Sequence, residues 1–346
     1  MAQSLKALLQ MSLLTAIVAA VLSLGGCGCG FDCNNGSGDG DNGDTALLDL
    51  GFSDALPEEL TEVVIQVESI TLRRSDGDVV INTFTIADLE LEDAENFQVN
   101  MLDYPGARQL LVVQDLEVAS GAYNGIFIEI SATDPDGNDS YVTELESGER
   151  KPLVLSGGGL ALRGFELSAG EQAYTIEFEL ARSLDYQAQP DNYLLTTEGF
   201  RVVNSITSAS LSGIVDPDLF DTVTQCDEKL DPLVGNRLYL YQGAGLNIDS
   251  LSDVFNDDSR EDIPSGAIAP FAVSRVFFNQ VTGNWDYAFG FLPAGDYTLV
   301  FACDTEDDDS VDYDGLTVPL PAEQLYEINL ENRENATCNL GDELSC

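Results

Sequence analysis

The feature that most constrains the fold of this chain is the alternation of apolar and polar side chains. From Leu47 to about Ser205, and again after Ser208, apolar residues recur at every second position. Such a period places successive side chains on opposite faces of a strand. The pattern therefore predicts half-buried antiparallel strands and an all-β fold. In the clearest segment, Thr175, Glu177 and Glu179 alternate with Tyr174, Ile176, Phe178 and Leu180.

Two further segments predict local geometry. Ile126, Ile128 and Ile130 share one face of a predicted strand. In the segment 63–72 the apolar phase slips by one residue between Val67 and Ile70, as it does where a β-bulge inserts an extra residue.

Two short polar segments have the composition of turns. Ser75–Asp78 and Asp134–Asn138 are rich in the Asp, Gly, Asn and Pro residues that turns need for backbone reasons. The second segment also has the spacing of a cation-binding loop. Because a hairpin turn requires the same residues, the turn is the favoured interpretation.

The alternation restarts in the second half of the chain. Strands are predicted at 211–215, 237–241, 285–289 and 291–301. Gly121-Ala-Tyr123 and Gly295-Asp-Tyr297 repeat the same short pattern, which suggests that both halves share one plan. We expect two antiparallel β-sandwich-like domains, residues 47–205 and 206–346, after a signal peptide at 1–26 and a flexible Gly/Asn/Asp-rich tether at 27–46.

The N-terminal segment predicts export. An apolar run from Ala7 to Leu24 follows Lys6, and Leu24-Gly25-Gly26-Cys27 resembles the lipobox of bacterial lipoproteins. The resemblance implies cleavage before Cys27, acylation of that cysteine and anchoring in the lipid bilayer without a spanning helix. The residue after the acylated cysteine is Gly28 and not Asp, and by the sorting rule of Gram-negative lipoproteins this favours the outer membrane over retention in the inner membrane. The alternatives are a plain secretory signal or an N-terminal helix.

The charge of the chain is strongly acidic. Its 346 residues include 61 acidic and 14 basic side chains, and removal of residues 1–26 leaves 13 basic side chains and a net charge of −48 in place of −47. Such a charge repels nucleic acid and anionic lipid surfaces. It either attracts cations or basic partners or serves solubility in a salty exterior, and we favour solubility. The hydrophobic fraction of 44% suffices for one or two cores.

The seven cysteines fit an oxidising compartment. If Cys27 carries lipid, six remain as disulfide candidates: Cys29, Cys33, Cys226, Cys303, Cys338 and Cys346. The most local solution pairs Cys29 with Cys33 and the other four among themselves. Zinc is disfavoured, because the distal cysteines stand far apart and the chain has no histidine.

The missing residue types argue against an enzyme. Without histidine, Ser-His-Asp and Cys-His nucleophile systems are excluded. Beyond residue 26 the lysines are Lys151 and Lys229, with no motif around them, and no GxSxG or P-loop segment is present. A carboxylate pair for glycoside hydrolysis stays open, but no pair stands out in the sequence.

Two binding sites can be imagined. Trp285 with Tyr287, and Tyr239 with Tyr241, share strand faces and could stack on sugar rings, although packing in the core or at its rim is the favoured interpretation. The acidic residues after Cys303 could bind calcium, although a solvated loop is favoured. These acidic residues are Asp304, Glu306, Asp307, Asp308, Asp309, Asp312 and Asp314. No other cofactor is expected.

Motifs in the first half resemble those of a known family. They are Phe52-Ser-Asp-Ala-Leu-Pro, the strand Val63–Leu72, Asn100-Met-Leu-Asp103, and Ala119-Ser-Gly-Ala-Tyr123 leading into Ile126–Ile130. Together they resemble the bacterial lipoproteins with domain of unknown function 4382. The chain departs from that pattern at Leu56, which separates Ala55 from Pro57, and at Ser120, where proline is common. The resemblance implies a location in the cell envelope and a fold class, but it implies no activity.

The second half resembles another group of β-sandwiches. Leu211-Ser-Gly-Ile-Val215 and Phe291-Leu-Pro-Ala-Gly-Asp-Tyr297 are similar to motifs of carboxypeptidase-regulatory-like, transthyretin-like domains. In that motif Leu292 packs inward, Pro293 and Gly295 form the turn, and Tyr297 begins a buried strand.

The sequence as a whole predicts a membrane-anchored, non-catalytic acidic lipoprotein of the cell envelope. We expect it to act as a binding or structural module at the surface or in the periplasm, with a protein or glycan partner that the sequence does not identify. A calcium- or carbohydrate-binding adhesion module is the alternative, and a carboxylate-only hydrolase is a distant third.

Overall fold

The all-β prediction is confirmed by the computed structural model, which describes residues 44–55, 60–132, 139–221, 226, 231–255, 263–306, 308, 312–341 and 346. The predicted signal peptide and most of the tether, including Cys27, Cys29 and Cys33, lie outside these residues, as does the predicted turn at Asp134–Asn138. No helix in the described part of the chain is long and apolar enough to span a membrane.

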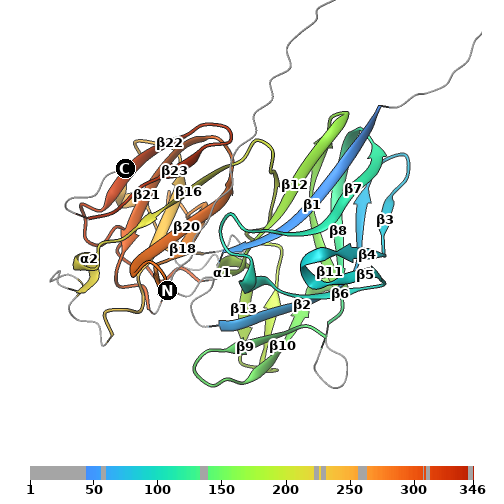
Figure 1. Ribbon diagram of the computed structural model, residues 1–346. Coiled ribbons are helices and arrows are strands. Elements are labelled where there is room, and N and C mark those ends of the chain that lie inside the picture. Colours follow the sequence, from blue (N-terminus) through green and yellow to red (C-terminus); the bar gives the residue numbers. More distant parts are fainter. Residues whose placement is uncertain are drawn as a thin grey trace, which may run out of the picture. The chain divides into compact units, whose positions relative to one another are not determined.

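The first sandwich begins with a four-stranded sheet in the order β15-β12-β1-β7. Its strands are β1 (Thr45–Ala55), β7 (Leu110–Ala119), β12 (Gly170–Glu179) and β15 (Arg201–Asn204). Figure 1 shows β1 and β12 side by side, and these two strands pair in parallel, in contrast to the predicted antiparallel arrangement. More than a hundred residues separate the two strands, so no hairpin imposes an antiparallel direction on them.

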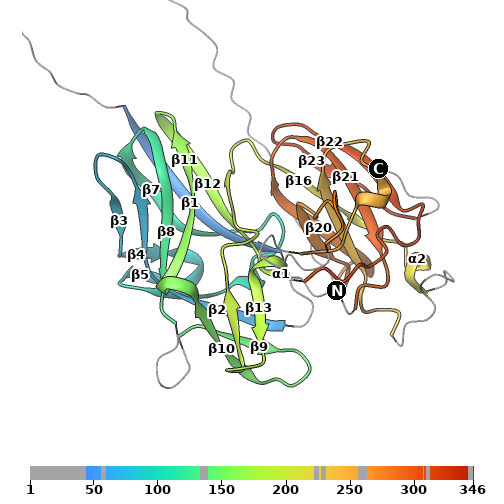
Figure 2. The same ribbon diagram turned by 180° about the vertical axis from the view of Figure 1, so that it is seen from behind.

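The opposing layer is a larger sheet in the order β11-β8-β2-β9-β10-β14-β13, with β3 and β6 also paired to β2. Figure 2 shows β11, β8, β2, β9, β10 and β13 of this sheet from behind. Their bounds are β2 (Leu60–Arg73), β3 (Val79–Ile81), β6 (Phe97–Asn100), β8 (Gly121–Ile130), β9 (Tyr141–Glu144), β10 (Arg150–Leu155), β11 (Gly159–Leu167), β13 (Leu184–Gln187) and β14 (Asn192–Leu195). Strands β4 (Phe84–Ile86) and β5 (Leu91–Ala94) pair with each other and form a separate two-stranded sheet.

Two sequence predictions are confirmed in this sheet. The register of β2 against β8 shifts between Val67 and Ser69, where the apolar phase slips. Ile126, Ile128 and Ile130 all face the core and are at most 3% exposed. Ring contacts join the two layers, since Phe52 of β1 lies 5.2 Å from Phe178 of its own sheet and 6.2 Å from Phe97 of β6.

The second sandwich consists of two four-stranded sheets. Their orders are β19-β20-β16-β23 and β18-β17-β21-β22. The strands are β16 (Ala209–Ile214), β17 (Arg237–Gln242), β18 (Ala272–Arg275), β19 (Phe277–Asn279), β20 (Asn284–Leu292), β21 (Gly295–Ala302), β22 (Leu325–Leu330) and β23 (Asn335–Thr337). No strand pairing joins these sheets to those of the first sandwich within the described residues.

Short helices and disulfides complete the fold. Helix α1 (Leu180–Ser183) follows β12, and α2 (Asp218–Asp221) follows β16. Cys226 is bonded to Cys303 and Cys338 to Cys346, so the four distal cysteines pair among themselves as predicted. The first of these disulfides joins a loop to the end of β21 and lies in the core of the second sandwich.

The repeated Gly-x-Tyr pattern marks the same local structure in both sandwiches. Tyr123 donates a hydrogen bond from its hydroxyl to the carbonyl of Ala119 at 2.8 Å, and Tyr297 donates one to the carbonyl of Pro293 at 2.7 Å. In each case the acceptor lies four residues upstream, and a glycine with positive φ, Gly121 or Gly295, begins the strand. Both rings are buried. Each buried tyrosine therefore holds the turn before its own strand against the core through this hydrogen bond.

Replacement of either tyrosine by phenylalanine should remove one buried hydrogen bond without leaving a cavity. We expect Tyr123→Phe and Tyr297→Phe each to lower the free energy of unfolding by about 1 kcal/mol, measured by urea denaturation. Tyr186→Phe is the control, because Tyr186 is 49% exposed and its hydroxyl bonds to Asp191 at the surface. Equal effects at all three positions would contradict this role.

Candidate functional site

The predicted sugar-stacking platform is corrected by the structure for three of its four residues. Tyr239 and Tyr241 have no exposed surface, and Tyr287 is 1% exposed. Their hydroxyls bond inward: Tyr239 to Asp308, Tyr241 to the carbonyl of Ser252 and Tyr287 to the carbonyl of Cys338. Tyr239 and Tyr241 are buried because Leu251, Val254 and Val318 pack over their face of the sheet. None of the three rings can stack on a sugar.

Trp285, the fourth residue of that prediction, lies at the rim of the second core. Its ring is half-buried and lies 5.2 Å from the rings of Phe220 and Phe278. Phe278 is 51% exposed and is the cross-strand partner of Trp285. Trp285 thus packs as a core-rim residue, which is the interpretation that the sequence favoured.

The acidic residues proposed for calcium do not act as one group in the described part of the chain. Asp304, Glu306, Asp312 and Asp314 are exposed, whereas Asp307 and Asp309 lie outside the described residues. Asp308 is buried, where it forms an ion pair with Arg237 and accepts a hydrogen bond from Tyr239 at 2.8 Å. Among the described residues, no group of three acidic or cysteine side chains is arranged to hold a metal ion. Calcium binding stays a prediction, but Asp308 has a structural partner.

A second buried acid near this pair was missed by the sequence analysis. Asp253 has no exposed surface and accepts a hydrogen bond from the backbone N–H of Leu316 at 2.8 Å. Burial raises its pKa to about 6, and the charge of Asp308 acts in the same direction. Asp253 thus joins the loop after β17 to the loop after β21, and Asp308 ties the loop after β21 to strand β17.

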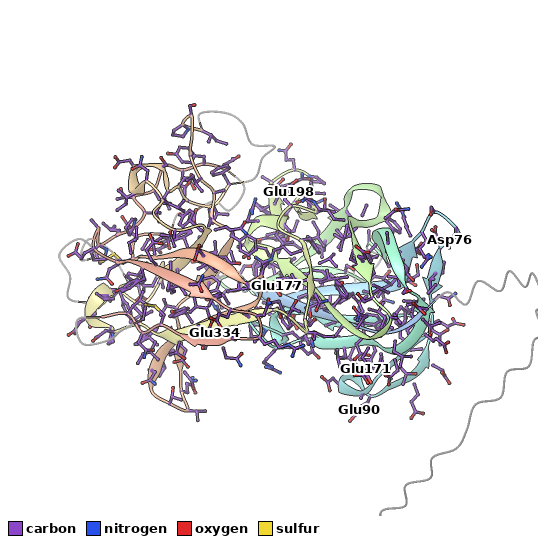
Figure 3. The ribbon with its side chains drawn as sticks, turned by 90° about the horizontal axis from the view of Figure 1, so that it is seen from above. Asp76, Glu90, Glu171, Glu177, Glu198 and Glu334 are labelled. Carbon is purple, nitrogen blue, oxygen red and sulfur yellow. A yellow bond between two sulfur atoms is a disulfide. The ribbon has the colours of Figure 1, made fainter. Side chains whose placement is uncertain are left out.

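Another concentration of buried charge lies where the two sandwiches meet, within one compact unit formed by residues 43–346. Strand β1 packs against β18, and β15 packs against β20. We call this contact the junction; it is lined by Asp54, Gly106, Glu177, Glu179, Arg201, Ala272, Ala288, Phe289 and Gly290. Figure 3 shows Glu177 in the interior, whereas Asp76 and Glu90 lie at the periphery.

Strand β12 supplies the acids of the junction. Its alternation predicts one apolar and one polar face, yet the polar face is also buried: Thr175, Glu177 and Glu179 are at most 2% exposed. Thr175 bonds at 2.6 Å to both Gln109 and Ser205, so it is satisfied within the first sandwich. Glu177 and Glu179 instead face the second sandwich. The carboxylate Oε2 of Glu177 and both carboxylate oxygens of Glu179 have no hydrogen-bond partner among the described residues.

Two arginines of the first sandwich reach the same place. Arg201 is the cross-strand partner of Glu177, and their charged atoms Nη2 and Oε1 are 3.8 Å apart. Arg201 also donates to the backbone carbonyl of Phe271 at 3.2 Å and lies over that ring at 4.4 Å. Arg182 of α1 donates to the carbonyl of Pro270 at 3.5 Å. Both acceptors lie directly before β18, the edge strand of its sheet.

Burial changes the protonation of both acids. It raises the pKa of Glu177 to about 8, although the charge of Arg201 opposes the shift. It also raises the pKa of Glu179 to about 7, opposed by Arg201 and Arg182. The cause is desolvation, which disfavours the ionised form. At neutral pH the junction therefore holds carboxyl groups that are largely or partly protonated.

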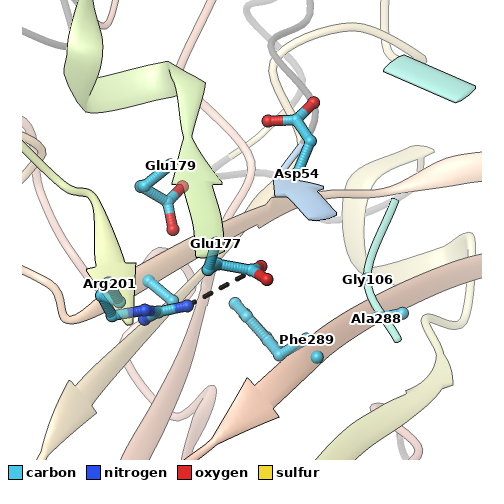
Figure 4. A pocket seen from close by; sticks show the side chains of 9 residues that line it. Asp54, Gly106, Glu177, Glu179, Arg201, Ala288 and Phe289 are labelled. Carbon is cyan, nitrogen blue, oxygen red and sulfur yellow. Dashed lines mark ion pairs between the residues drawn. The ribbon is translucent and has the colours of Figure 1, made fainter. Parts of the chain in front are cut away.

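The cavity between these groups is small. Its volume of about 10 Å³ is enough for about one water molecule. Figure 4 shows the carboxylates of Glu177 and Glu179 near the guanidinium of Arg201, while that of Asp54 points away. A wider groove of about 210 Å³, lined partly by Arg108, Arg275 and Phe277, lies beside the cavity and shares Gly106 and Ala288 with it.

Backbone atoms approach closely across the junction at Gly290. A Cβ atom on Gly290 would lie 2.0 Å from the carbonyl oxygen of Gly106, closer than any real contact. Gly106 itself has a φ of 61°, and the hydroxyl of Ser53 holds its carbonyl at 2.9 Å. The junction therefore needs a residue without a side chain at position 290.

The chemistry available at the junction is limited by access. Two acids with raised pKa values beside an arginine are the kind of set that acid–base catalysis uses. However, Glu177 and Glu179 are almost wholly buried, and a cavity of about 10 Å³ does not admit a sugar ring. In this arrangement the charged groups serve the contact between the sandwiches.

Comparison with known protein families confirms the domain that the first half resembles, and it does not test the lipoprotein nature. Residues 45–197 match the family described as "Domain of unknown function (DUF4382)". No curated protein sequence matches the chain.

Solved structures give only distant likenesses. The Bacillus anthracis TIE protein is 11% identical over 86% of this chain and 34% of its own length, with a TM-score of 0.17. The minor pilin of Streptococcus agalactiae is 13% identical over 84% of this chain and 94% of its own, with a TM-score of 0.18. The major pilin subunit of Bacillus cereus is 9% identical over 88% of this chain and 71% of its own length, with a TM-score of 0.17. Scores this low support no function for the chain.

The close approach at Gly290 gives a direct test of the junction. Gly290→Ala should lower the free energy of unfolding by more than about 2 kcal/mol, because the added methyl group forces the sandwiches apart. Gly148→Ala is the control: a Cβ at Gly148 meets no atom within 4 Å, so only about 1 kcal/mol of backbone strain is expected from its positive φ of 66°. Similar losses in thermal denaturation for both variants would argue against a tight junction.

Proposed function

We propose that this chain is a lipid-anchored protein of the cell envelope whose two β-sandwiches act together as a non-catalytic binding or structural module. The main observation behind this module is the junction, where two acids with raised pKa values lie between the two sandwiches. The lipobox-like segment that ends at Cys27 supports the anchor. Gly28 after that cysteine supports anchoring in the outer membrane.

The absence of catalysis in this proposal follows from how the junction is built. An acid–base pair needs substrate within hydrogen-bond reach of both groups. Here the groups that face Glu177 and Glu179 are the arginines Arg201 and Arg182, the hydroxyl of Ser53 and the backbone of the second sandwich. A substrate could enter only if the two sandwiches separated.

The second sandwich, residues 206–346, has features expected of a transthyretin-like, carboxypeptidase-regulatory-like domain. Leu292 is fully buried, Pro293 and Ala294 connect β20 to β21, and Tyr297 is fully buried near the start of β21. These positions agree with the roles that the resemblance implies for the motif. We propose that this domain is a structural partner of the first one.

The net charge limits the partners of the module. With 61 acidic residues, the chain would be repelled by nucleic acid and by anionic lipid headgroups, so its contact with the bilayer would depend on the acyl chains. A protein or glycan partner of neutral or basic surface is compatible with this charge.

Acylation at Cys27 is the step on which the anchor depends. When the full chain is produced in a Gram-negative host with labelled palmitate, we expect label on the protein and partition into the detergent phase. Cys27→Ala should lose both, because the acylated thiol is removed. Cys29→Ala is the matched control and should behave as the unchanged chain. Label retained by Cys27→Ala, or absent from the unchanged chain, would refute lipid anchoring.

A further inference from the structure

We propose that the junction is a proton-controlled contact, closed when Glu177 and Glu179 are protonated and loosened when they ionise. The proposal does not rest on acylation of Cys27 and would stand if the anchor failed its test. It concerns how the two sandwiches are held, and it gives the buried acids a role that the module alone does not require.

The geometry explains why ionisation would matter at this place. Glu177 and Glu179 are 2% and 1% exposed, and three of their four carboxyl oxygens lack a hydrogen-bond partner among the described residues. A buried carboxylate without such partners is strongly unfavourable, whereas a neutral carboxyl is tolerated. Ionisation would therefore draw water to these side chains. The groove beside the cavity, which shares Gly106 and Ala288 with it, provides the path.

The charges around the two acids do not compensate them fully. From the first sandwich, Arg201 faces both acids, Arg182 faces Glu179, and Asp54 lines the same cavity with a further acid. From the second sandwich, the lining residues Ala272, Ala288, Phe289 and Gly290 carry no charge. On that side the backbone N–H of Val273 favours ionised Glu179, although it makes no hydrogen bond of normal geometry with the carboxylate, and in the first sandwich the hydroxyl of Ser53 favours ionised Glu177. Arg201 and Arg182 also donate to the carbonyls of Phe271 and Pro270.

The direction of the pH effect follows from the raised pKa values. Once the sandwiches separate, water reaches both carboxyls and their pKa values return toward the ordinary 4.5. Below that pH both forms are protonated, and closure does not depend on pH. Above it the open form loses its protons while the closed form retains them, so closure weakens by up to about tenfold per pH unit for each carboxyl. The weakening ends near pH 7 for Glu179 and near pH 8 for Glu177.

Hydrogen–deuterium exchange of the full chain between pH 5 and 9 measures this opening directly. After correction for the intrinsic exchange rate, protection of a peptide covering residues 270–276 should fall at least about tenfold from pH 6 to pH 9. Protection of a peptide covering β8 should change much less. In Glu177→Gln/Glu179→Gln the fall at 270–276 should be abolished, because neither side chain can ionise.

Two controls separate this effect from general charge repulsion and from misfolding. Glu166→Gln/Glu171→Gln removes two charges at exposed positions and should keep the fall seen in the unchanged chain. The single variants should each keep one step: Glu177→Gln a step that ends near pH 7, and Glu179→Gln one that ends near pH 8. A fall that persists in the double variant, or protection at 270–276 that is constant with pH in the unchanged chain, would overturn the proposal.

Discussion

The contact between the two sandwiches, in which β1 packs against the edge strand β18 and β15 packs against β20, is the interaction on which the unit depends. An edge strand leaves backbone N–H and C=O groups without a partner in its own sheet. Here side chains of the other sandwich lie along that edge: Arg201 and Arg182 donate to the carbonyls of Phe271 and Pro270 directly before β18, and Glu179 faces the N–H of Val273 within it. The edge is protected, but two acids must be buried to achieve it, and this couples the contact to protons.

Inside each sandwich, single buried hydrogen bonds also fix one segment of the chain on another. Tyr123 and Tyr297 use one hydroxyl bond to the carbonyl four residues upstream, and each follows a glycine that begins the strand. In the second sandwich, Asp308 holds the loop after β21 on strand β17, and Asp253 joins the loop after β17 to the loop after β21. Most other acids remain on the surface, where their mutual repulsion is screened by salt.

Local patterns in the sequence predicted local structure well. The phase slip between Val67 and Ile70 located the register shift of β2, and the repeated Gly-x-Tyr located two equivalent turns. The failures concern faces that a distant segment covers. Glu177 and Glu179 alternate like a solvent-facing row, and Tyr239 and Tyr241 like a platform, because alternation does not show what packs on the second face of a sheet. The cross-strand pairing of Glu177 with Arg201 is likewise invisible without the fold.

The central claim, that the two acids are held protonated in the closed junction, is tested most directly by their own titration. Carbon-13 NMR of the side-chain carboxyl groups, assigned by comparison with Glu177→Gln and Glu179→Gln, reports the two pKa values in the intact unit. The account predicts titration near pH 8 for Glu177 and near pH 7 for Glu179. If both carboxyls titrate near the ordinary value of 4.5, the acids are solvated and the junction described here is wrong.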